Sequence, residues 1–550
     1  MQTELQTALT TESTTESTTE STTESTTEST TESTTESTTD STTKSTTETT
    51  TETTTELQTE STTEVPAEWQ STVQPASAWV GSFGATHFGA AKLGDKRLTD
   101  RLVKVADAIV RHPGGSLPEK MHDPVALNAL YYLMDCDAVT HASVLAPHRE
   151  LTLRKMAAHA GKVLVLHDTT ELDFTGHKSL EDTGQIGNGS RRGWLCHHAL
   201  VVSPQTREVL GLAGQILQAR ATVRKNESVA NKRARVDRAS RLWRAGTQGL
   251  PADRNIVDVC DRGADTFEFL EHELLRSGRT FVVRSSHDRA LLPGHTGEAQ
   301  RSRLHRHARA QPSLGQWTIQ VPAAQMKKNT KHGQSRSTKT TIVQRQKRDA
   351  VLQVSAAPIR LCAPARKSGE HGTAPLPLWI VRVWEPSPPE GVEPLEWFLL
   401  TNHPVTTFEQ AKEVAEWYEI RWMIEEFHKA QKTGCRIEDP QFTSSQRLHP
   451  MIALLSVVAL SLLNLRELSR RPAAKTRPAT DVILSDYVSR LSTWRHHAEQ
   501  PDWTIHDFCQ ALARLGGHQN RKQDHPPDWI TLQTMLDGAN ALRRLRPRCA

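Results

Sequence analysis

"KVLVLHD", residues 162–168, is a short run rich in leucine and valine that ends on an aspartate, a pattern typical of a buried strand. A second such run, "NIVDVCD" at 255–261, also ends on an aspartate. Further strand-like runs and helical stretches lie between and after these two: runs from Leu195, Val209 and Thr280, and helices at 227–245 and 266–276. Strands followed by an alternation of strand and helix predict an α/β domain with a mixed sheet.

The segments around this α/β core have other patterns. Residues 76–160 predict a small helical domain, in which Asp123 and Pro124 form a good helix start. Within the core, residues 161–440, the piece at about 287–393 is rich in Pro, Gly and basic residues among strand-like runs, and predicts a β-rich insertion. "EWFLLTN" from Glu396 returns to the main sheet. Residues 441–550 predict a third, helical domain, whose Trp/Leu-bearing end suits a partner helix.

The N-terminal 75 residues are dominated by a Thr/Ser/Glu repeat with an acidic residue at almost every fourth position. This composition cannot bury a core, so we expect a disordered tail. Residues 1–68 contain 15 acidic residues and one lysine, a net charge of −14. Because the whole chain carries +4, the rest carries +18. Such a basic body suits a polyanion, and a basic surface that binds nothing is the alternative.

Several function classes are disfavoured by composition. The seven cysteines are scattered without CxxC pairs, which indicates reduced thiols in the cytoplasm and no zinc site. The longest apolar run, from Met451, is interrupted by Ser456, Ser461 and Asn464, so we expect a buried helix and no membrane partner. The Thr-rich tail would suit a mucin-like surface protein, but the N-terminus lacks a signal peptide.

One helix carries an unusual set of polar residues. In "YEIRWMIEEFHKAQKTG", residues 418–434, a turn of about 100° per residue places Tyr418, Arg421, Glu425 and Lys432 on one narrow stripe. Ile424 and its apolar neighbours fall on the other side. The stripe is therefore predicted to face something other than the core, although a solvated face with ion pairs gives the same pattern.

Three carboxylates stand out by position: Asp168 and Asp261, each at the predicted end of an interior strand, and Glu425 on this helix. A buried carboxylate is costly unless it is paired or binds a metal, and Mg²⁺ prefers oxygen ligands. Taken singly, an aspartate after a strand is more often a helix N-cap. Together with a basic body, the three predict a magnesium site that acts on a phosphodiester.

The predicted helix at 95–111 places Lys96, Arg97, Arg101 and Lys104 in its exposed turns. Basic residues in this arrangement suit a DNA phosphate backbone, and they equally suit a solvated helix face.

The spacing Y-(2)-R-(3)-E-(6)-K in residues 418–434 is preceded along the chain by five further motifs. In order, they are "LGDKRLTDRLVKVA", "HDTTELDF", "SRRGW", "CDRGADTFEFL" and "FVVRSSH". With these motifs the chain resembles DDE transposases of bacterial insertion sequences, in the group that includes the transposase of the kanamycin-resistance composite transposon. The resemblance implies a ribonuclease-H-like catalytic core between helical DNA-binding and dimerisation domains.

The resemblance also implies roles for single residues. Asp168, Asp261 and Glu425 match catalytic carboxylates that bind two Mg²⁺ ions, with Mn²⁺ as a substitute. The residues that match DNA-binding positions are Tyr418, Arg421, Lys432, Arg284, Arg97 and Arg101. Trp397 matches an aromatic that stacks on a base flipped from the DNA end, whereas a strand Trp in general more often packs in a core.

The implied activity is cut-and-paste transposition. A nick at the transposon end is followed by a hairpin, which is opened before the end joins target DNA. The implied partners are double-stranded DNA, at transposon ends and target, and a second copy of the chain in a homodimer. The alternative is a catalytically silent DNA-binding regulator derived from a transposase.

Overall fold

A computed structural model describes residues 82–515 except 188, 223–225, 293–301, 322–323, 332–337, 346, 366–370, 484 and 501. The tail predicted at 1–75 and the Trp/Leu-bearing end after residue 515 lie outside the described residues.

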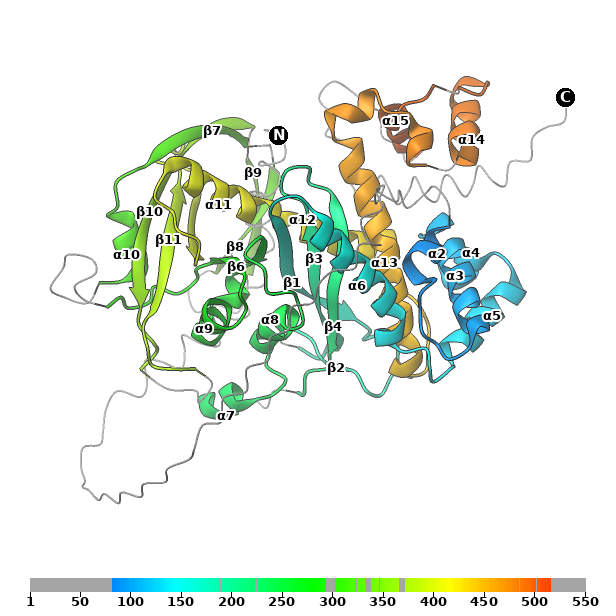
Figure 1. Cartoon of the computed structure of the whole chain (residues 1–550), viewed down its shortest axis with the longest axis horizontal. Coiled ribbons are helices and arrows are strands. Elements are labelled where there is room, and N and C mark those ends of the chain that lie inside the picture. Colours follow the sequence, from blue (N-terminus) through cyan, green and yellow to red (C-terminus); the bar gives the residue numbers. More distant parts are fainter. Residues whose placement is uncertain are drawn as a thin grey trace, which may run out of the picture. The chain divides into compact units, whose positions relative to one another are not determined.

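A large mixed sheet organises the chain, as the sequence predicts (Figure 1). Its strands follow the order β2-β3-β1-β5-β6-β12-β11-β10-β7, with β4 also paired to β3. The first part consists of β1 (Val163–Asp173), β2 (Gly184–Gln185), β3 (Arg192–Val202), β4 (Val209–Gln218), β5 (Ile256–Cys260) and β6 (Thr280–Arg284). β1, β5 and β6 are parallel to one another, and β3 runs antiparallel to β1. The fold is therefore α/β and consistent with a ribonuclease-H-like core.

The β-rich insertion extends the same sheet. β12 (Glu396–Thr401) returns to the main sheet as predicted, where it pairs with β6, and β11 (Leu376–Trp384), β10 (Arg348–Leu361) and β7 (Gly315–Val321) add to it in turn. β8 (Ala324–Lys331) and β9 (Thr338–Arg345) form a separate two-stranded sheet, and α10 (Leu304–Arg309) precedes β7. Alternate residues of β10 are buried, so one edge of the core sheet continues as a half-buried antiparallel sheet.

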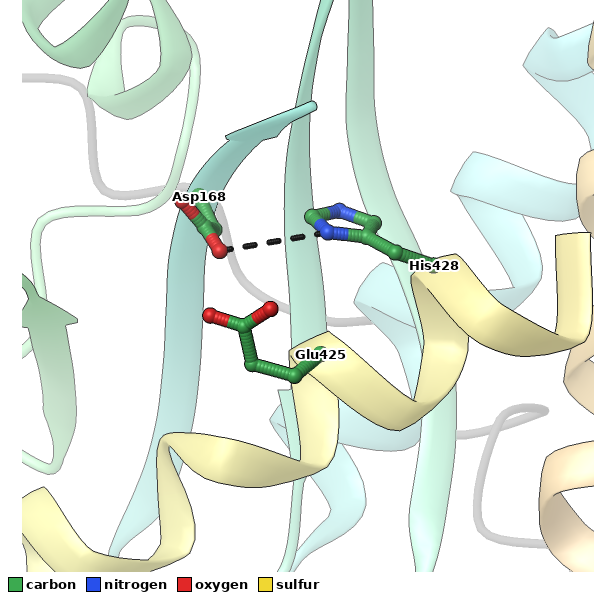
Figure 2. Close-up of side chains that lie close together, drawn as sticks. All are labelled: Asp168, Glu425 and His428. Carbon is green, nitrogen blue, oxygen red and sulfur yellow. Dashed lines mark ion pairs between the residues drawn. The ribbon is translucent and has the colours of Figure 1, made fainter. Parts of the chain in front are cut away.

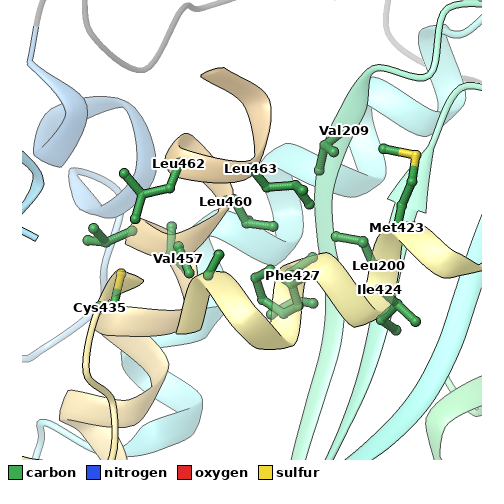
Figure 3. Packing of buried hydrophobic residues seen from close by; sticks show 14 of the residues in the cluster. Leu200, Val209, Met423, Ile424, Phe427, Cys435, Val457, Leu460, Leu462 and Leu463 are labelled. Atoms are coloured by element: carbon green, nitrogen blue, oxygen red, sulfur yellow. The ribbon is translucent and has the colours of Figure 1, made fainter. Parts of the chain in front are cut away.

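Helices cover both faces of the sheet. Successive residues of a strand point to opposite faces, and both sets are apolar here, so each face needs a cover. Leu166 and Leu200 pack in one cluster with Ile424 and Phe427 of α12 (Trp422–Lys429), which Figure 3 shows in part. This face also receives α11 (Phe408–Ile420) and α13 (Ser445–Ser469). The opposite face packs against α8 (Ser240–Thr247) and α9 (Phe267–Leu275). The helix predicted at 227–245 is in fact two, α7 (Val229–Ala234) and α8, separated by a turn.

Capped helices precede the sheet: α2 (Phe83–Phe88), α3 (Lys96–Arg111), α4 (Leu117–Met121), α5 (Pro124–Met134) and α6 (His141–Ala158). Asp95 begins α3 by accepting a hydrogen bond from the Arg97 backbone N–H at 2.8 Å. Asp123 caps α5 in the same way through the N–H groups of Val125 and Ala126. These caps confirm the predicted helix starts at Asp95 and Asp123.

The 25-residue α13 is long and apolar enough to cross a membrane, the one such helix among the described residues. However, 89% of its most apolar window is buried inside the protein, against elements that include α6 and β4. This is the environment of a core helix, as the sequence predicts. The described residues after α13 form the 3₁₀ turns Pro472–Lys475 and Ala479–Asp481, followed by α14 (Ser485–His496) and α15 (Ile505–Leu515).

Candidate active site

Asp168 lies in the middle of β1, so the prediction that it ends its strand is wrong. Pairing with β3 carries β1 five residues further, to Asp173 opposite Gly193. Pairing with β5 stops earlier, at His167 opposite Cys260. Asp261 follows β5 directly, as predicted. Because neighbouring parallel strands lie about 4.8 Å apart, this register places Asp168 and Asp261 side by side where β5 ends.

The turn after β5 fixes the Asp261 carboxylate. Asp261 caps the 3₁₀ turn Arg262–Ala264 and accepts a hydrogen bond from the Gly263 N–H at 2.7 Å. A Cβ on Gly263 would lie 2.9 Å from the Trp243 ring and 3.0 Å from Asp261 Oδ1. Only glycine fits this turn without displacing the Trp243 ring or the carboxylate. The N-cap interpretation is therefore correct for one oxygen of Asp261, and it holds this side chain at the end of the strand.

Glu425 and Arg421 approach Asp168 from the helical layer. Arg421 lies between the two carboxylates, with Nη1 3.6 Å from Asp168 Oδ2 and Nη2 3.5 Å from Glu425 Oε1. Ligand atoms of Asp168, Glu425 and His428 all lie within 4.8 Å of one another (Figure 2). Two of the predicted carboxylates are thus brought into one cluster, and a histidine joins them.

The cluster carries more negative charge than its surroundings compensate. Burial raises the pKa of Asp168 well above its usual range, and the charges of Glu425 and Asp261 raise it further. Arg421 and the Thr169 N–H oppose this shift only in part. Carboxylates that repel one another at the end of a strand fit a divalent cation with oxygen ligands. Asp168, Asp261 and Glu425 are therefore the residues that would hold it.

The predicted polar stripe does not behave as one surface. Tyr418 is fully buried in the main apolar cluster and Arg421 is 2% exposed, so the prediction is wrong for Tyr418. The run is not one regular helix: α11 ends at Ile420, and the bonds Arg421 N–H to Tyr418 O and Ile424 N–H to Arg421 O tighten the turn. A π turn, Ala430–Gly434, follows α12. Overwinding and then underwinding shift the faces from their ideal 100° spacing.

Lys432 is the most exposed member of the former stripe. Its side chain is 34% exposed, its Nζ donates to the Glu171 carbonyl at 2.6 Å, and Glu438 Oε1 lies 3.9 Å away. Glu171 is three residues beyond Asp168 on β1. Lys432 is therefore anchored beside the carboxylates, with its ammonium partly open to solvent.

Trp397 and Arg284 lie in the sheet layer and are largely buried. Trp397 is 7% exposed and packs edge-on against Tyr418, with ring centroids 5.2 Å apart. Arg284 ends β6, is also 7% exposed, and lies opposite Leu399 of β12. The core-packing alternative for Trp397 thus describes its environment here, and its role in base stacking stays a prediction.

The basic residues of α3 belong to a different part of the chain from the three carboxylates. Lys96, Arg97, Arg101 and Lys104 are all exposed on α3, as predicted, whereas the intervening Leu102 and Val105 are buried. This face of α3 is positive and open to a large anionic partner.

His428 was not predicted from the sequence. It follows Glu425 by three residues, and a spacing of three places two side chains on the same face of a helix. The spacing was therefore a usable signal. Its Nδ1 lies 3.9 Å from Asp168 Oδ2, and its Nε2 lies 3.1 Å from His198 Nδ1.

Comparison with protein families gives two matches. The model of the Transposase DNA-binding family matches residues 81–139, which include α3 and its basic face. The model of the Transposase DDE domain matches residues 159–462, which include the sheet, Asp168, Asp261 and Glu425. The second match covers more than half of the chain. DDE domains use divalent metal, in agreement with the carboxylate cluster, and the chain belongs to the DDE transposase family.

Proposed function

We propose that this transposase performs cut-and-paste transposition: it cleaves DNA at the ends of an insertion sequence, forms a hairpin on the element end and joins that end to target DNA. The observation that carries the proposal is the arrangement of Asp168 and Asp261 at the end of β5 with Glu425 opposite them. The raised pKa of Asp168 supports it, because that carboxylate lacks full compensation within the protein.

Two Mg²⁺ ions bound by these carboxylates would supply an activated water or 3′-hydroxyl and stabilise the leaving oxygen of a phosphodiester. The protein's own part is to orient the DNA. Arg421 lies between Asp168 and Glu425, so its guanidinium is positioned to neutralise a phosphate as well as a carboxylate. Lys432 contributes a second, more exposed cation next to β1.

Recognition of the transposon ends is assigned to the exposed basic face of α3, formed by Lys96, Arg97, Arg101 and Lys104. Contacts of lysine and arginine with phosphates supply affinity and orientation, whereas base contacts supply specificity. Cut-and-paste transfer requires both ends to be held together, so we propose that two copies of the chain form a homodimer on paired ends. Arg284, Tyr418 and Trp397 complete the proposed DNA-binding set.

The test uses the full chain with Mg²⁺ and a labelled duplex that carries the terminal repeats flanking its reading frame. We expect nicked, hairpin and double-strand-break products to appear in that order on a denaturing gel, and EDTA to stop them. Glu425→Gln should bind the duplex and leave it intact. The matched control is Glu416→Gln on α11, whose carboxylate is 48% exposed and pairs with Lys412 on the surface, and it should cleave normally.

The same experiment separates the enzyme from a silent DNA-binding regulator. A regulator would retard the duplex on a native gel and yield no nick with either Mg²⁺ or Mn²⁺. Binding without cleavage by the wild-type chain would therefore reject the proposed activity and keep the family assignment.

A further inference from the structure

A buried row of polar residues crosses the sheet beside the carboxylates. Asp168 of β1 lies directly opposite His198 of β3, and His198 lies directly opposite Gln215 of β4. Residues opposite one another in antiparallel strands point to the same face. The three side chains therefore form a row beneath α12, and His198 is fully buried.

A second polar row runs along the helix that covers the first. Glu425, His428 and Gln431 recur at three-residue intervals through α12 and the π turn. His428 Nε2 lies 3.1 Å from His198 Nδ1, and Gln431 Nε2 lies 3.0 Å from His198 Nε2. The two rows thus meet at His198, which is in contact with both.

Ser456 of α13 fixes the orientation of the two amides. Its hydroxyl donates to the Ile452 carbonyl at 2.7 Å, so its oxygen is left to accept. It accepts from Gln215 Nε2 at 2.7 Å and from Gln431 Nε2 at 2.8 Å. The same two Nε2 atoms lie 2.9 and 3.0 Å from His198 Nε2. The orientation of Gln215 is also set by its Oε1, which lies 2.9 Å from His141 Nε2, so the Gln215 Nε2–H faces His198 Nε2. His198 Nε2 therefore accepts from Gln215, and a neutral His198 carries its proton on Nδ1.

The position of the proton on His198 determines the position of the proton on His428. His198 Nδ1–H donates to His428 Nε2, so a neutral His428 carries its own proton on Nδ1. His428 Nδ1, the atom that carries this proton, lies 3.9 Å from Asp168 Oδ2, which is longer than a hydrogen bond (Figure 2).

We propose that His428 is a positioning residue, whose Nδ1–H attracts the Asp168 carboxylate across this distance, and that it is not a metal ligand although its ring lies within 4.8 Å of the ligand atoms of Asp168 and Glu425. A ligand would need a lone pair at Nδ1, and the network of His198, Gln215, Gln431 and Ser456 places a proton there. The inference rests on the proposed function, because it assigns His428 to the same carboxylate site. Groups that orient metal ligands typically change metal affinity or activity by about 10- to 100-fold.

Three variants at residue 428 separate a donor from a ligand. In His428→Asn, an amide N–H takes the approximate place of Nδ1–H; His428→Asp supplies an oxygen ligand and no donor; His428→Ala supplies neither. We expect cleavage by the alanine variant to slow by roughly 10- to 100-fold, the asparagine variant to recover at least tenfold of that loss, and the aspartate variant to recover none. Cleavage by the aspartate variant at or above the asparagine level would overturn the proposal, as would equal rates for all three.

The network behind His428 offers a test that leaves the site itself unchanged. Ser456→Ala removes the hydroxyl that orients both amides, and we expect it to slow cleavage by roughly three- to tenfold, the range of one buried hydrogen bond. The matched control is Ser461→Ala on the same helix, which is also buried and bonds only the Val458 carbonyl among the described contacts. Equal rates for the two serine variants would contradict the relay.

A spectroscopic measurement tests the tautomer without any DNA. In ¹⁵N-histidine-labelled full-length protein, the His428 ring, identified by its loss in His428→Asn, should show a protonated Nδ1 and an unprotonated Nε2. The opposite tautomer would overturn the inference even if the enzyme cleaves normally. The expected tautomer in a chain that fails to cleave would instead reject the proposed function and retain the hydrogen-bond assignment.

Discussion

Two adjacent residues of β1, His167 and Asp168, belong to opposite faces of the sheet and to two different kinds of buried polar cluster. On the His167 face, Asp258 accepts from His167 at 2.9 Å and pairs with Arg279 at 2.5 Å. These contacts lower the pKa of Asp258 although it is fully buried. Burial and the charge of Asp258 raise the pKa of a second carboxyl there, Glu273.

The Asp168 face also buries carboxylates beside an arginine, but there the carboxylates outnumber the positive charge. Arg421 lies 3.6 Å from Asp168 and 3.5 Å from Glu425, and burial together with the charges of Glu425 and Asp261 raises the pKa of Asp168. Asp258 is compensated by Arg279 and His167, whereas the carboxylates around Asp168 outnumber the one arginine that lies between two of them. The lesson is that burial of an acid does not mark function, whereas incomplete compensation of several acids does.

The largest expected effect is loss of cleavage on the Asp168 face. Asp168→Asn, Asp261→Asn or Glu425→Gln should each slow cleavage by about a thousandfold or more, since a lost metal ligand removes several kcal/mol of transition-state stabilisation. Binding to transposon ends, measured by gel retardation, should stay within a few-fold of wild type. The melting temperature should stay level or rise, because each change relieves repulsion. Near-normal nicking by one variant would remove that residue from the site.

The mirror experiment on the other face should affect stability instead. Asp258→Asn removes the carboxylate closest to the buried Arg279, whose other carboxyl neighbour, Glu273, lies 3.7 Å away, and breaking such a buried pair costs about 3–5 kcal/mol. We expect the loss in urea unfolding, equally with and without Mg²⁺. If Asp258→Asn folded as stably as wild type but failed to cleave, the division into a structural and a functional face would be wrong.

Trp397 tests whether the Asp168 face also has a structural part. It is buried against Tyr418, so Trp397→Ala should cost about 3 kcal/mol of stability through the cavity it leaves. If Trp397 also stacks on a flipped base during the reaction, hairpin formation should slow about 10- to 100-fold beyond any slowing of the nick, as 1–3 kcal/mol of stacking implies.

Leu399→Ala is the control for this effect. Leu399 is fully buried two residues further along the same strand and belongs to the same apolar cluster. The leucine variant should lose stability and slow both steps equally. Equal slowing in Trp397→Ala would assign Trp397 to the core alone.

The sequence predicts much of this fold because its strongest signals are local. Runs of valine and leucine identify β1 and β5, Asp95 and Asp123 mark helix starts, and the aspartate after β5 marks a turn. The spacing around Glu425 identifies a helix that carries polar residues. These features depend on residues close together in the chain, which is why they can be read without the structure.

The missed features depend on contacts between distant segments. The tight turn at Arg421 places Tyr418 in the core, and no local sequence pattern predicts this turn. His198 and Gln215 meet Asp168 only because of the β1–β3–β4 register, and β3 and β4 shift their register at Ala199/Leu200 and again at Val201/Val202. Such irregularities re-aim side chains, so a row across three strands cannot be counted from the sequence.

The smallest expected effect comes from deleting the acidic N-terminal segment, which should change DNA affinity and leave the stability of the fold unchanged. Residues 1–68 carry −14 against +18 on the rest of the chain, so they compete with DNA for basic surfaces such as α3. Their deletion should raise affinity for transposon ends by roughly threefold to tenfold at low salt, with the difference shrinking as salt screens both interactions. Urea unfolding of the sheet, including the Asp258 cluster, should not change.

The measurement is a DNA titration at two salt concentrations, with a chain in which the acidic residues of 1–68 are replaced by Gln or Asn as the matched control. Because that control keeps the length and removes the charge, it should behave like the deletion. If the deletion weakened DNA binding, the segment would be supplying contacts, and the competition would be refuted.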